Sequence, residues 1–494
     1  MRFEPPREVV DFVDLLCTRH QSDGYRTVQH TTRRTLAILL NHFGCFSALI
    51  LTSVCTMSLG LCTPSQLSLF CGRNYRLFDG LLSCAISYVL SLIPSSNISL
   101  IVDDTDRPRS KVIKALSYVF KTVCKKTSGF HLAQNIVFVC AVTKYFTFPI
   151  AWKFYMPDPA ISTWRALKRK FKSQKCCKGK NVKACCLRCK DLLKKIEKCP
   201  ERDAEKYPSR LEIAVIILAR SKKYLCVSSN SSKVLKVMSI CADAAYLSPI
   251  FLLETAKIFP GTQIISQLKS TQKVCSRTQE PISVKEYFQS KKLHNKTIII
   301  RGTEKNIEYI NGKLTVKSHG KKLLIIAMRY ESETEYRYLV ATDLGWRPED
   351  VIRHYALRWL VEVDIEDWKQ NSGFGKGACL QGDEGASCAL SLSLLSVFLF
   401  LTHPLQLRLL RSGQPLCTAG SLSQRLYADF LMHNVGRIIM SEDPKKAYEQ
   451  VKVAVEEAFI LRSSKKHAGV AFLYPVIENT KPWYKRFNFF SSSS

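Results

Sequence analysis

The chain has 494 residues, with 73 Lys and Arg against 41 Asp and Glu and a formal net charge of +32. This length allows about two to four domains and a large core. The charge favours a polyanionic partner, nucleic acid before an anionic membrane, over a chain that is merely basic. The 20 cysteines are scattered and the first residues hold no apolar signal core, so we expect mostly free thiols in a reducing compartment.

Two apolar segments raise the question of a membrane. Residues 35–62 are interrupted by Asn41, His42 and several small residues, and residues 386–402 form a shorter apolar run. A membrane-spanning helix needs about 20 consecutive apolar residues. Both segments are therefore expected to be buried helices.

Hydrophobic periodicity and turn residues predict a series of strands and helices. In chain order we expect helical patches over 1–97, a strand at 99–104, a hairpin of strands at 136–143 and 146–155 beside it, a helix at 207–221, a strand at 237–243, a helix to about 258, a strand at 262–268, a polar β-rich stretch, a strand at 338–343 and a long helix opening at Arg347. This order predicts a mixed α/β sheet interrupted by a β insertion.

The expected organisation has five parts. They are an N-terminal helical region (1–97), the first part of an α/β core (98–268), a β-rich insertion (269–334), the second part of the core with the long helix (335–440) and a C-terminal helix and tail (441–494).

A basic, cysteine-rich excursion is expected at 165–206, within the first part of the core. Its cysteines include the pair Cys176 and Cys177 and a Cys-x2-Cys at Cys186 and Cys189, with Cys199 close behind. Four thiolates suffice for zinc, but this spacing fits no standard finger and adjacent cysteines rarely bind one ion together. A basic loop with free thiols is favoured over a zinc site. Its Lys and Arg side chains can neutralise phosphates whatever the base sequence, or they form a solvated linker.

The long helix carries a narrow polar row. At about 100° per residue, Tyr355, Arg358, Glu362 and Lys369 fall within an arc of roughly 60°. Glu366 lies close to the same arc, so geometry leaves Glu362 and Glu366 both open. Such a row suits the holding of a metal ion beside a phosphate backbone.

Acids follow two of the expected strands. Asp103, Asp104 and Asp106 end the first strand, and Asp243 ends the later one. Successive strand residues point to opposite faces, so only one of Asp103 and Asp104 can face a given site, and periodicity does not choose between them. Asp243 has a second interpretation, as a cap of the helix that follows it. Two or three converging carboxylates are sufficient to hold two Mg²⁺ ions about 4 Å apart across a phosphate.

With these residues the chain resembles bacterial DDE transposases. Val102-Asp-Asp104-Thr, Ala242-Asp243-Ala-Ala-Tyr246 and the helix pattern Tyr-x2-Arg-x3-Glu-x6-Lys are similar to motifs of the insertion-sequence-four superfamily, over roughly residues 99–405. The resemblance implies an RNase H-like catalytic domain with a β insertion, which acts on DNA ends and joins them to target DNA.

The resemblance also implies roles for single residues. The metal ligands would be Asp104, directly before Thr, with Asp243 and Glu362, which decides against Glu366. Their cofactor would be Mg²⁺ at a two-metal site, with Mn²⁺ as a possible substitute.

The remaining residues of the signature would meet DNA. Tyr355 and Arg358 would contact phosphates, and Lys369 would hold the backbone of the transferred end. The implied partners are double-stranded DNA and further copies of the chain, as a homodimer or higher synaptic assembly, without a membrane. The implied location is the bacterial cytoplasm, at the nucleoid.

Two departures from the family pattern stand out. Arg107-Pro-Arg109 follows the Asp-Thr motif where Lys-Gly is frequent, and the first 97 residues match no known DNA-binding module. Three alternatives stay open: an RNase H-like nuclease that only cuts, a catalytically dead DNA-binding remnant, and a basic protein of the membrane surface.

Overall fold

The computed structural model describes residues 1–46, 51–60, 62–93, 97–109, 116–123, 129–172, 194–227, 235–276, 280–374 and 380–458. One mixed sheet of 12 strands runs through this part of the chain. The strands are β1 (Asn97–Arg109), β2 (Val119–Val123), β3 (Phe130–Val142), β4 (Thr147–Tyr155), β5 (Lys236–Ala242), β6 (Gln263–Leu268), β7 (Lys273–Cys275), β8 (Ile282–Ser283), β9 (His294–Ile300), β10 (Thr303–Val316), β11 (Lys321–Tyr330) and β12 (Arg337–Ala341).

Five strands form the centre of the sheet, in the order β4-β3-β1-β5-β6. β1 pairs with β3 and β3 with β4 in antiparallel fashion, whereas β1 pairs with β5 and β5 with β6 in parallel. Every residue of the mainly apolar run Ile98–Val102 is buried, as suits a strand covered on both faces. The predicted hairpin beside the first strand and the predicted mixed α/β class are confirmed.

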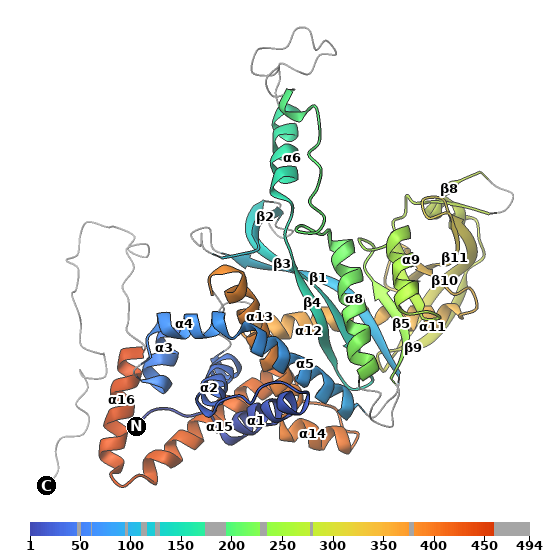
Figure 1. Ribbon diagram of the computed structural model, residues 1–494. Helices are drawn as coiled ribbons and strands as arrows, with labels where there is room; N and C mark the ends of the chain where they lie inside the picture. Colours follow the sequence, from blue (N-terminus) through green and yellow to red (C-terminus); the bar gives the residue numbers. More distant parts are fainter. Residues whose placement is uncertain are drawn as a thin grey trace, which may run out of the picture.

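Beyond β6 the sheet continues as antiparallel strands, in the order β12-β11-β10-β7-β8, with β9 beside β10. These strands form the lobe at the right of Figure 1. Residues 269–334, expected to be β-rich, supply most of this lobe, and their described part holds one short helix, α10 (Val284–Gln289). The chain then returns through β12 to the edge of the central strands.

Helices surround the sheet and build a second lobe from the two ends of the chain. They are α1 (Arg7–Ser22), α2 (His30–Phe46), α3 (Leu51–Val54) with a π-helical turn (Cys55–Leu59), α4 (Pro64–Arg73), α5 (Tyr75–Leu92), α6 (Pro159–Lys172), α8 (Arg210–Val227), α9 (Pro249–Ile258), α10 (Val284–Gln289), α11 (Pro348–Ala356), α12 (Arg358–Asn371), α13 (Gly382–Leu401), α14 (Pro404–Arg411), α15 (Ala419–Ile439) and α16 (Pro444–Ala458). In Figure 1, α1–α5 and α13–α16 gather below the sheet.

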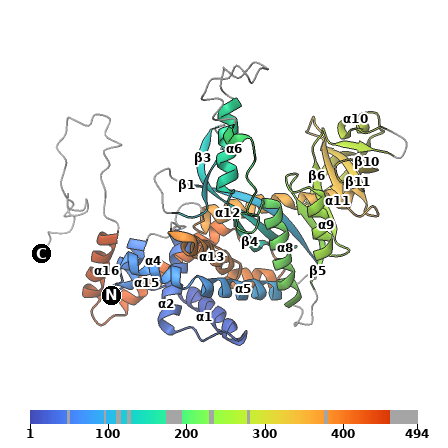
Figure 2. The ribbon, with the colours of Figure 1, turned by 45° about the horizontal axis from the view of Figure 1, so that its top comes forward.

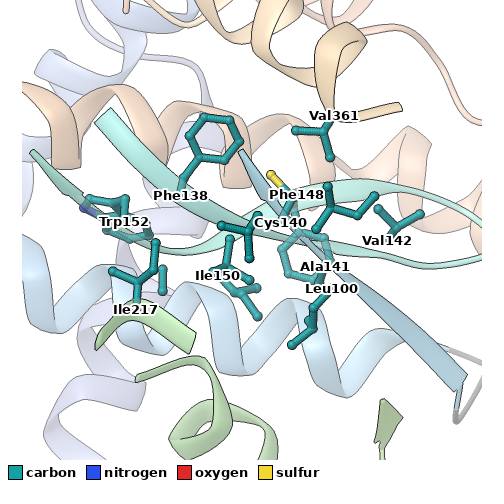
Figure 3. Packing of buried hydrophobic residues seen from close by; sticks show 14 of the residues in the cluster. Leu100, Phe138, Cys140, Ala141, Val142, Phe148, Ile150, Trp152, Ile217 and Val361 are labelled. Carbon is teal, nitrogen blue, oxygen red and sulfur yellow. The ribbon is translucent and has the colours of Figure 1, made fainter. Parts of the chain in front are cut away.

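Two helices cover opposite faces of the central strands. In Figure 3, Val361 of α12 and Ile217 of α8 approach the strands from opposite sides, with Phe148 and Ile150 of β4 between them. All four side chains are buried. The two helices thereby define a front face, under α12, and a back face, under α8.

The apolar helix α13 is a core helix of this fold. It is long and apolar enough to cross a membrane, yet 83% of that stretch is buried inside the protein. Apolar residues lie all around it because α2, α4 and α5 pack against it. The expectation of a buried helix at 386–402 is confirmed.

The expectation of one uninterrupted helix after Arg347 is wrong. The helix begins as predicted, with Pro348 in its first turn and the acids Glu349 and Asp350 behind it. It breaks at Leu357, whose N–H bonds to the carbonyl of His354 only three residues back, at 3.2 Å. This tighter turn separates α11 from α12, so the predicted polar row is divided between two helices.

Candidate active site

Acids come together where the parallel pairing of β1 with β5 ends, although β1 itself continues to Arg109 beside β3. Val102 of β1 pairs with Ala242 of β5, and Asp103 and Asp243 are the next residues on each strand. The two carboxylates are close enough for Asp243 to contribute to the pKa of Asp103. Asp243 does not cap the next helix, because the hydroxyl of Ser248 accepts the N–H of Phe251 there at 3.1 Å.

Asp103 faces the front of the sheet, under α12. Its Oδ2 accepts a hydrogen bond from Arg358 Nη1 at 3.2 Å, and its Oδ1 accepts one from the N–H of Asp104 at 2.8 Å. Burial raises the pKa of Asp103 to about 6, and the carboxylates of Asp104 and Asp243 add to the rise, against the opposing effects of the Asp104 amide and Arg358. Burial therefore disfavours the ionised form of Asp103 more than Arg358 and the Asp104 amide favour it.

Asp104 points to the opposite face. Its Oδ1 accepts a hydrogen bond from the hydroxyl of Tyr246 at 3.0 Å, and its Oδ2 accepts one from Asn135 Nδ2 at 2.7 Å. Arg210 Nε, at the start of α8, lies 3.7 Å from the same Oδ2. Burial and then the charge of Asp104 raise the pKa of Tyr246 well above its usual range, so Tyr246 stays a donor.

The back face continues this network with a second acid. Asn135 Nδ2 also donates to Asp106 Oδ1 at 2.8 Å, and Asn135 Oδ1 accepts from Arg210 Nε at 3.2 Å. Asn135 is fully buried in β3, and Asp106 lies opposite it in the strand register. Asp104 and Asp106 thus belong to a connected polar network that joins β1 to β3 and α8.

Arg358 connects the front of β1 to the helix above it. Its Nη2 donates to Glu362 Oε1 at 2.6 Å, one turn further along α12, while its Nη1 contacts Asp103. Glu362 is 48% exposed and Arg358 24% exposed. Glu366, the alternative acid on this helix, instead accepts a hydrogen bond from Gln370 at 2.9 Å. The structure therefore brings Glu362 and Asp103 to the same cation and leaves Glu366 outside this contact.

Lys369 of α12 contacts the same face of β1 two residues beyond Asp103, at Thr105. Its Nζ donates to Thr105 Oγ1 at 2.6 Å. Thr105 is buried and shares a face with Asp103 because strand residues alternate. The front of β1 thus presents Asp103 and Thr105 to two cations of α12.

Tyr355, on α11, points to the next strand of the sheet. Its hydroxyl donates to Gln267 Oε1 of β6 at 3.1 Å. Burial raises the pKa of Tyr355 to about 12, with Asp243 among the groups that add to the rise. Tyr355 is therefore neutral at physiological pH and lies close to Asp243.

The oxygen donors Asp103, Asp243 and Glu362 suit a hard divalent cation in their chemistry. Within the ranges described, no three His, Cys, Asp or Glu side chains are grouped closely enough to hold a metal ion. The guanidinium of Arg358 instead lies between Asp103 and Glu362. Two acids that share one guanidinium, with Asp243 after the neighbouring strand, are the arrangement that fits a site for added positive charge.

A cavity of about 370 Å³ opens beside this site, between the β lobe and the two helices. The β lobe contributes Arg301, Lys305 and Arg337, and the helices contribute Arg358 and Trp359, with no acid in the lining. The guanidinium of Arg301 lies 4.1 Å from the centre of the half-exposed Trp359 ring. Trp368, the other tryptophan of α12, is buried and donates to Ser393 at 2.8 Å.

Sequence reasoning missed the residues that hold the site from other elements. Asn135 and Arg210 complete the back network, and Gln267 holds Tyr355. Only Asn135 had a signal, since a polar residue inside the apolar run of β3 needs a partner. Arg107 is one of the basic residues that follow the Asp-Thr motif. It does not line the site, because it is buried against the ring of Phe374. The predicted cysteine cluster at Cys176–Cys189 lies outside the residues described, and Cys199 is exposed.

Comparisons with known proteins give a remote likeness to solved structures. No family model matches the chain, and no curated protein matches it significantly in sequence. Among solved structures, a cryo-EM structure of a piggyBac transposase synaptic complex with hairpin DNA is similar, with 10% identity and a TM-score of 0.39 over 90% of this chain and 82% of that chain. A likeness this remote carries no argument about the site or the reaction. The insertion-sequence-four resemblance of the motifs stays a prediction.

Proposed function

We propose that the protein is a DDE-type DNA transposase, which hydrolyses phosphodiester bonds at the ends of its element and joins the freed 3′-OH to target DNA. One observation carries the proposal: Asp103 and Asp243 follow the last parallel pair of β1 and β5, and Arg358 of α12 joins Asp103 to Glu362 while Lys369 contacts Thr105. In this proposal β4-β3-β1-β5-β6 is an RNase H-like core, and the strands beyond β6 are its insertion.

The metal ligands we propose are Asp103, Asp243 and Glu362. Asp103 replaces Asp104 in this set because Asp104 faces α8 and is bound there by Tyr246 and Asn135, whereas Asp103 shares Arg358 with Glu362. Mg²⁺ is the expected ion, with Mn²⁺ as a substitute. When bound, two such ions activate water and neutralise charge on the scissile phosphate.

The cations of α12 have a second task, which is to hold phosphates. The planar fork of Arg358 matches a phosphate as well as two carboxylates. If Asp103 and Glu362 held a metal ion, Arg358 would be available to bind the DNA backbone. Lys369 follows about three turns later on α12, and the neutral hydroxyl of Tyr355 is a third donor toward phosphate oxygens.

The net charge and the acid-free cavity beside Arg358 both favour DNA as the substrate. We propose that the chain acts as a homodimer or higher assembly on paired ends, as the motif resemblance implies. A nuclease with the same ligands and a dead DNA-binding remnant are the alternatives.

Metal binding and DNA chemistry test the proposal separately. Mn²⁺ binding, followed by electron paramagnetic resonance, is compared between the wild type and Asp103→Asn, Asp243→Asn and Glu362→Gln. Glu366→Gln is the matched control on the same helix. We expect each of the three variants to weaken Mn²⁺ binding by at least tenfold, and the control to leave it unchanged. Equal binding by all variants would contradict the assignment.

The reaction is then followed on a plasmid that carries the DNA flanking the gene, with Mg²⁺. Cut ends and joined products together support a transposase. Cut ends without joined products indicate a nuclease, and metal-independent binding without cleavage indicates a remnant.

A further inference from the structure

A helical arm stands off the sheet on the side away from the helical lobe. It is formed by α6 (Pro159–Lys172), which rises from the end of β4, and by the returning chain 194–209, which leads into α8. Figures 1 and 2 show α6 projecting beyond the ends of the neighbouring strands. The name basic arm is used below for α6 and residues 194–209.

The base of the basic arm is fixed by a buried carboxylate. Asp158 is 8% exposed, and its Oδ1 accepts the N–H groups of Ala160 and Ile161 at 2.8 and 3.3 Å, as an N-cap of α6. Its Oδ2 accepts the N–H of Asp203 in the returning chain at 3.2 Å. One side chain therefore joins both limbs where they leave the sheet.

Further contacts hold the two limbs along their length. Trp164 Nε1 donates to the carbonyl of Ile196 at 3.1 Å. At the lower end of the return, Arg202 donates to both oxygens of Glu212 of α8, at 2.7 and 2.6 Å. The arm is thus a braced projection whose charged residues have a defined place relative to the sheet.

The charge of α6 is entirely positive, whereas the return 194–209 carries four acids (Glu197, Glu201, Asp203 and Glu205) beside five cations. The helix segment PAISTWRALKRKFK has no acid. Arg165, Lys168, Arg169 and Lys170 are exposed, and so are Lys194, Lys195 and Lys198 of the return, where Glu197 is the one acid among residues 194–200. At about 100° per residue, Arg165, Lys168 and Arg169 share one face of α6.

A solvated helix face would normally alternate its charges. Here like charges stand three and four residues apart, which costs a few tenths of a kcal/mol per pair. In the part of the chain that the structure describes, Arg165, Lys168 and Arg169 have no ion pair with a carboxylate. Part of this repulsion is offset at the helix C-terminus, where cations are favoured, but Arg165 lies near the middle of α6. A polyanion would relieve the rest.

We propose that the basic arm binds the phosphate backbone of duplex DNA outside the active site. Arg165, Lys168 and Arg169 span about 6 Å along the helix axis, over which one DNA strand carries about two to three phosphates. The inference rests on the proposed function in one respect, that the substrate is DNA. It adds a second contact that is independent of the metal ligands and of base sequence.

The test measures the salt dependence of binding to a duplex of about 40 base pairs, by fluorescence anisotropy in EDTA, so that no metal-dependent step contributes. The arm variant carries Arg165→Gln, Lys168→Gln and Arg169→Gln. The matched control carries Lys317→Gln, Lys321→Gln and Lys322→Gln, which removes three exposed lysines of the β lobe. All six side chains are exposed, and circular dichroism melting checks that both variants fold as the wild type does.

We expect the log–log salt slope of the arm variant to fall by about two to three units, since each phosphate contact contributes about 0.9. Its affinity near 0.1 M salt should fall on the order of 10²-fold, and the control should change by less than one unit. Equal slopes for the arm variant and the control overturn the proposal. So does a loss of affinity that appears only with single-stranded DNA or with duplex RNA.

The same measurement on Asp103→Asn separates this proposal from the proposed function. We expect that variant to keep the full salt slope and to lose metal-dependent cleavage. If the arm variant has a smaller salt slope and the wild type never cleaves DNA, the DNA-binding role of the arm is supported and the transposase proposal is refuted. Cleavage by the wild type with an unchanged slope in the arm variant refutes the arm alone.

Discussion

The two faces of β1 carry the same residue type and use it differently. On the back face, Asp104 and Asp106 share the amide of the buried Asn135. On the front face, Asp103 and Thr105 meet the cations of α12. Neighbouring residues of one strand therefore take part in two separate networks.

The difference lies in which groups surround each carboxylate, because both oxygens of each acid accept a hydrogen bond. Asp104 is bound by Tyr246 and Asn135 inside the fold, so it resembles the buried polar groups that stabilise folded proteins. Asp103 shares its guanidinium with a second acid, Glu362, and burial raises its pKa to about 6. A carboxylate that shares one cation with another carboxylate is suited to binding a further cation. The comparison predicts that the back acid stabilises the fold and the front acid performs the chemistry.

Substitution of Asp103 gives the largest effect on activity. Under the proposed function, Asp103→Asn lowers the rate of metal-dependent DNA cleavage on the order of 10³-fold, because a metal ligand and its charge are lost. The free energy of unfolding should change little, since the amide has the size of the carboxyl group and burial already disfavours the ionised form of Asp103. Single-turnover cleavage and thermal melting measure the two effects. A variant that cleaves normally would remove Asp103 from the metal ligands.

Substitution of Asp104 is the reciprocal experiment. Asp104→Ala removes the acceptor of Tyr246 and leaves Asn135 with Asp106 as acceptor, and should cost about 1–3 kcal/mol of unfolding free energy. Activity should fall less than in Asp103→Asn, by about 10–100-fold, as for residues that position a ligand. Urea denaturation with Glu366→Ala as an exposed control measures the cost. Full stability combined with complete loss of cleavage would reverse the roles of the two acids.

Sequence patterns located most of this arrangement because the apolar runs at 98–102 and 237–242 are unambiguous. The acid after the second run lies at the end of its strand as expected, but the expected end of the first strand at Asp104 is wrong, because β1 continues to Arg109 beside β3. The choice between Asp103 and Asp104 did not follow, since alternation says that they differ but not which face α12 covers. Packing partners decide that question: Val361 of α12 lies on one side of the sheet and Ile217 of α8 on the other.

The remaining site residues come from elements whose position the chain order does not reveal. Arg210 begins a helix expected from periodicity, but its contact with Asp104 depends on how α8 crosses the back face. Gln267 meets Tyr355 because the helix breaks at Leu357, where no Gly or Pro marks a break. Local sequence gives the elements, whereas these contacts depend on register and on a tertiary turn.

The front face also depends on how firmly α11 is held over the sheet. Glu349, buried in the first turn of α11, accepts hydrogen bonds from Lys296 at 2.6 Å and from Tyr309 at 3.1 Å, both in the β lobe. Burial alone would raise the pKa of Glu349, but the Lys296 ammonium and the Tyr309 hydroxyl hold it at about 2. The contact ties the β lobe to the helix pair that carries Tyr355 and Arg358.

We expect Glu349→Gln to lower the unfolding free energy by about 1 kcal/mol at pH 7, because Lys296 is half exposed and water screens the pair. Because folding lowers the pKa of Glu349, its carboxylate stabilises the folded protein fully above the unfolded pKa of 4.5. This stabilisation is lost as the pH falls toward 2. Urea denaturation at pH 7 and pH 3 should therefore show a smaller difference between the two proteins at pH 3. A difference that grows on acidification would contradict the ion-pair explanation.

Lys369→Ala gives the smallest effect and the sharpest test of the front face as a DNA surface. Two roles are possible for a lysine that donates to Thr105: it fixes α12 to β1, or it exchanges that contact for a phosphate. The second role predicts weaker DNA binding, with a log–log salt slope smaller by about one unit. Lys285→Ala, an exposed lysine of α10, is the control of equal charge and should shift the slope by less. If Lys369→Ala lowers the melting temperature and leaves the slope unchanged, Lys369 only joins the helix to the strand, and the phosphate-binding side of the front face reduces to Arg358 and Tyr355.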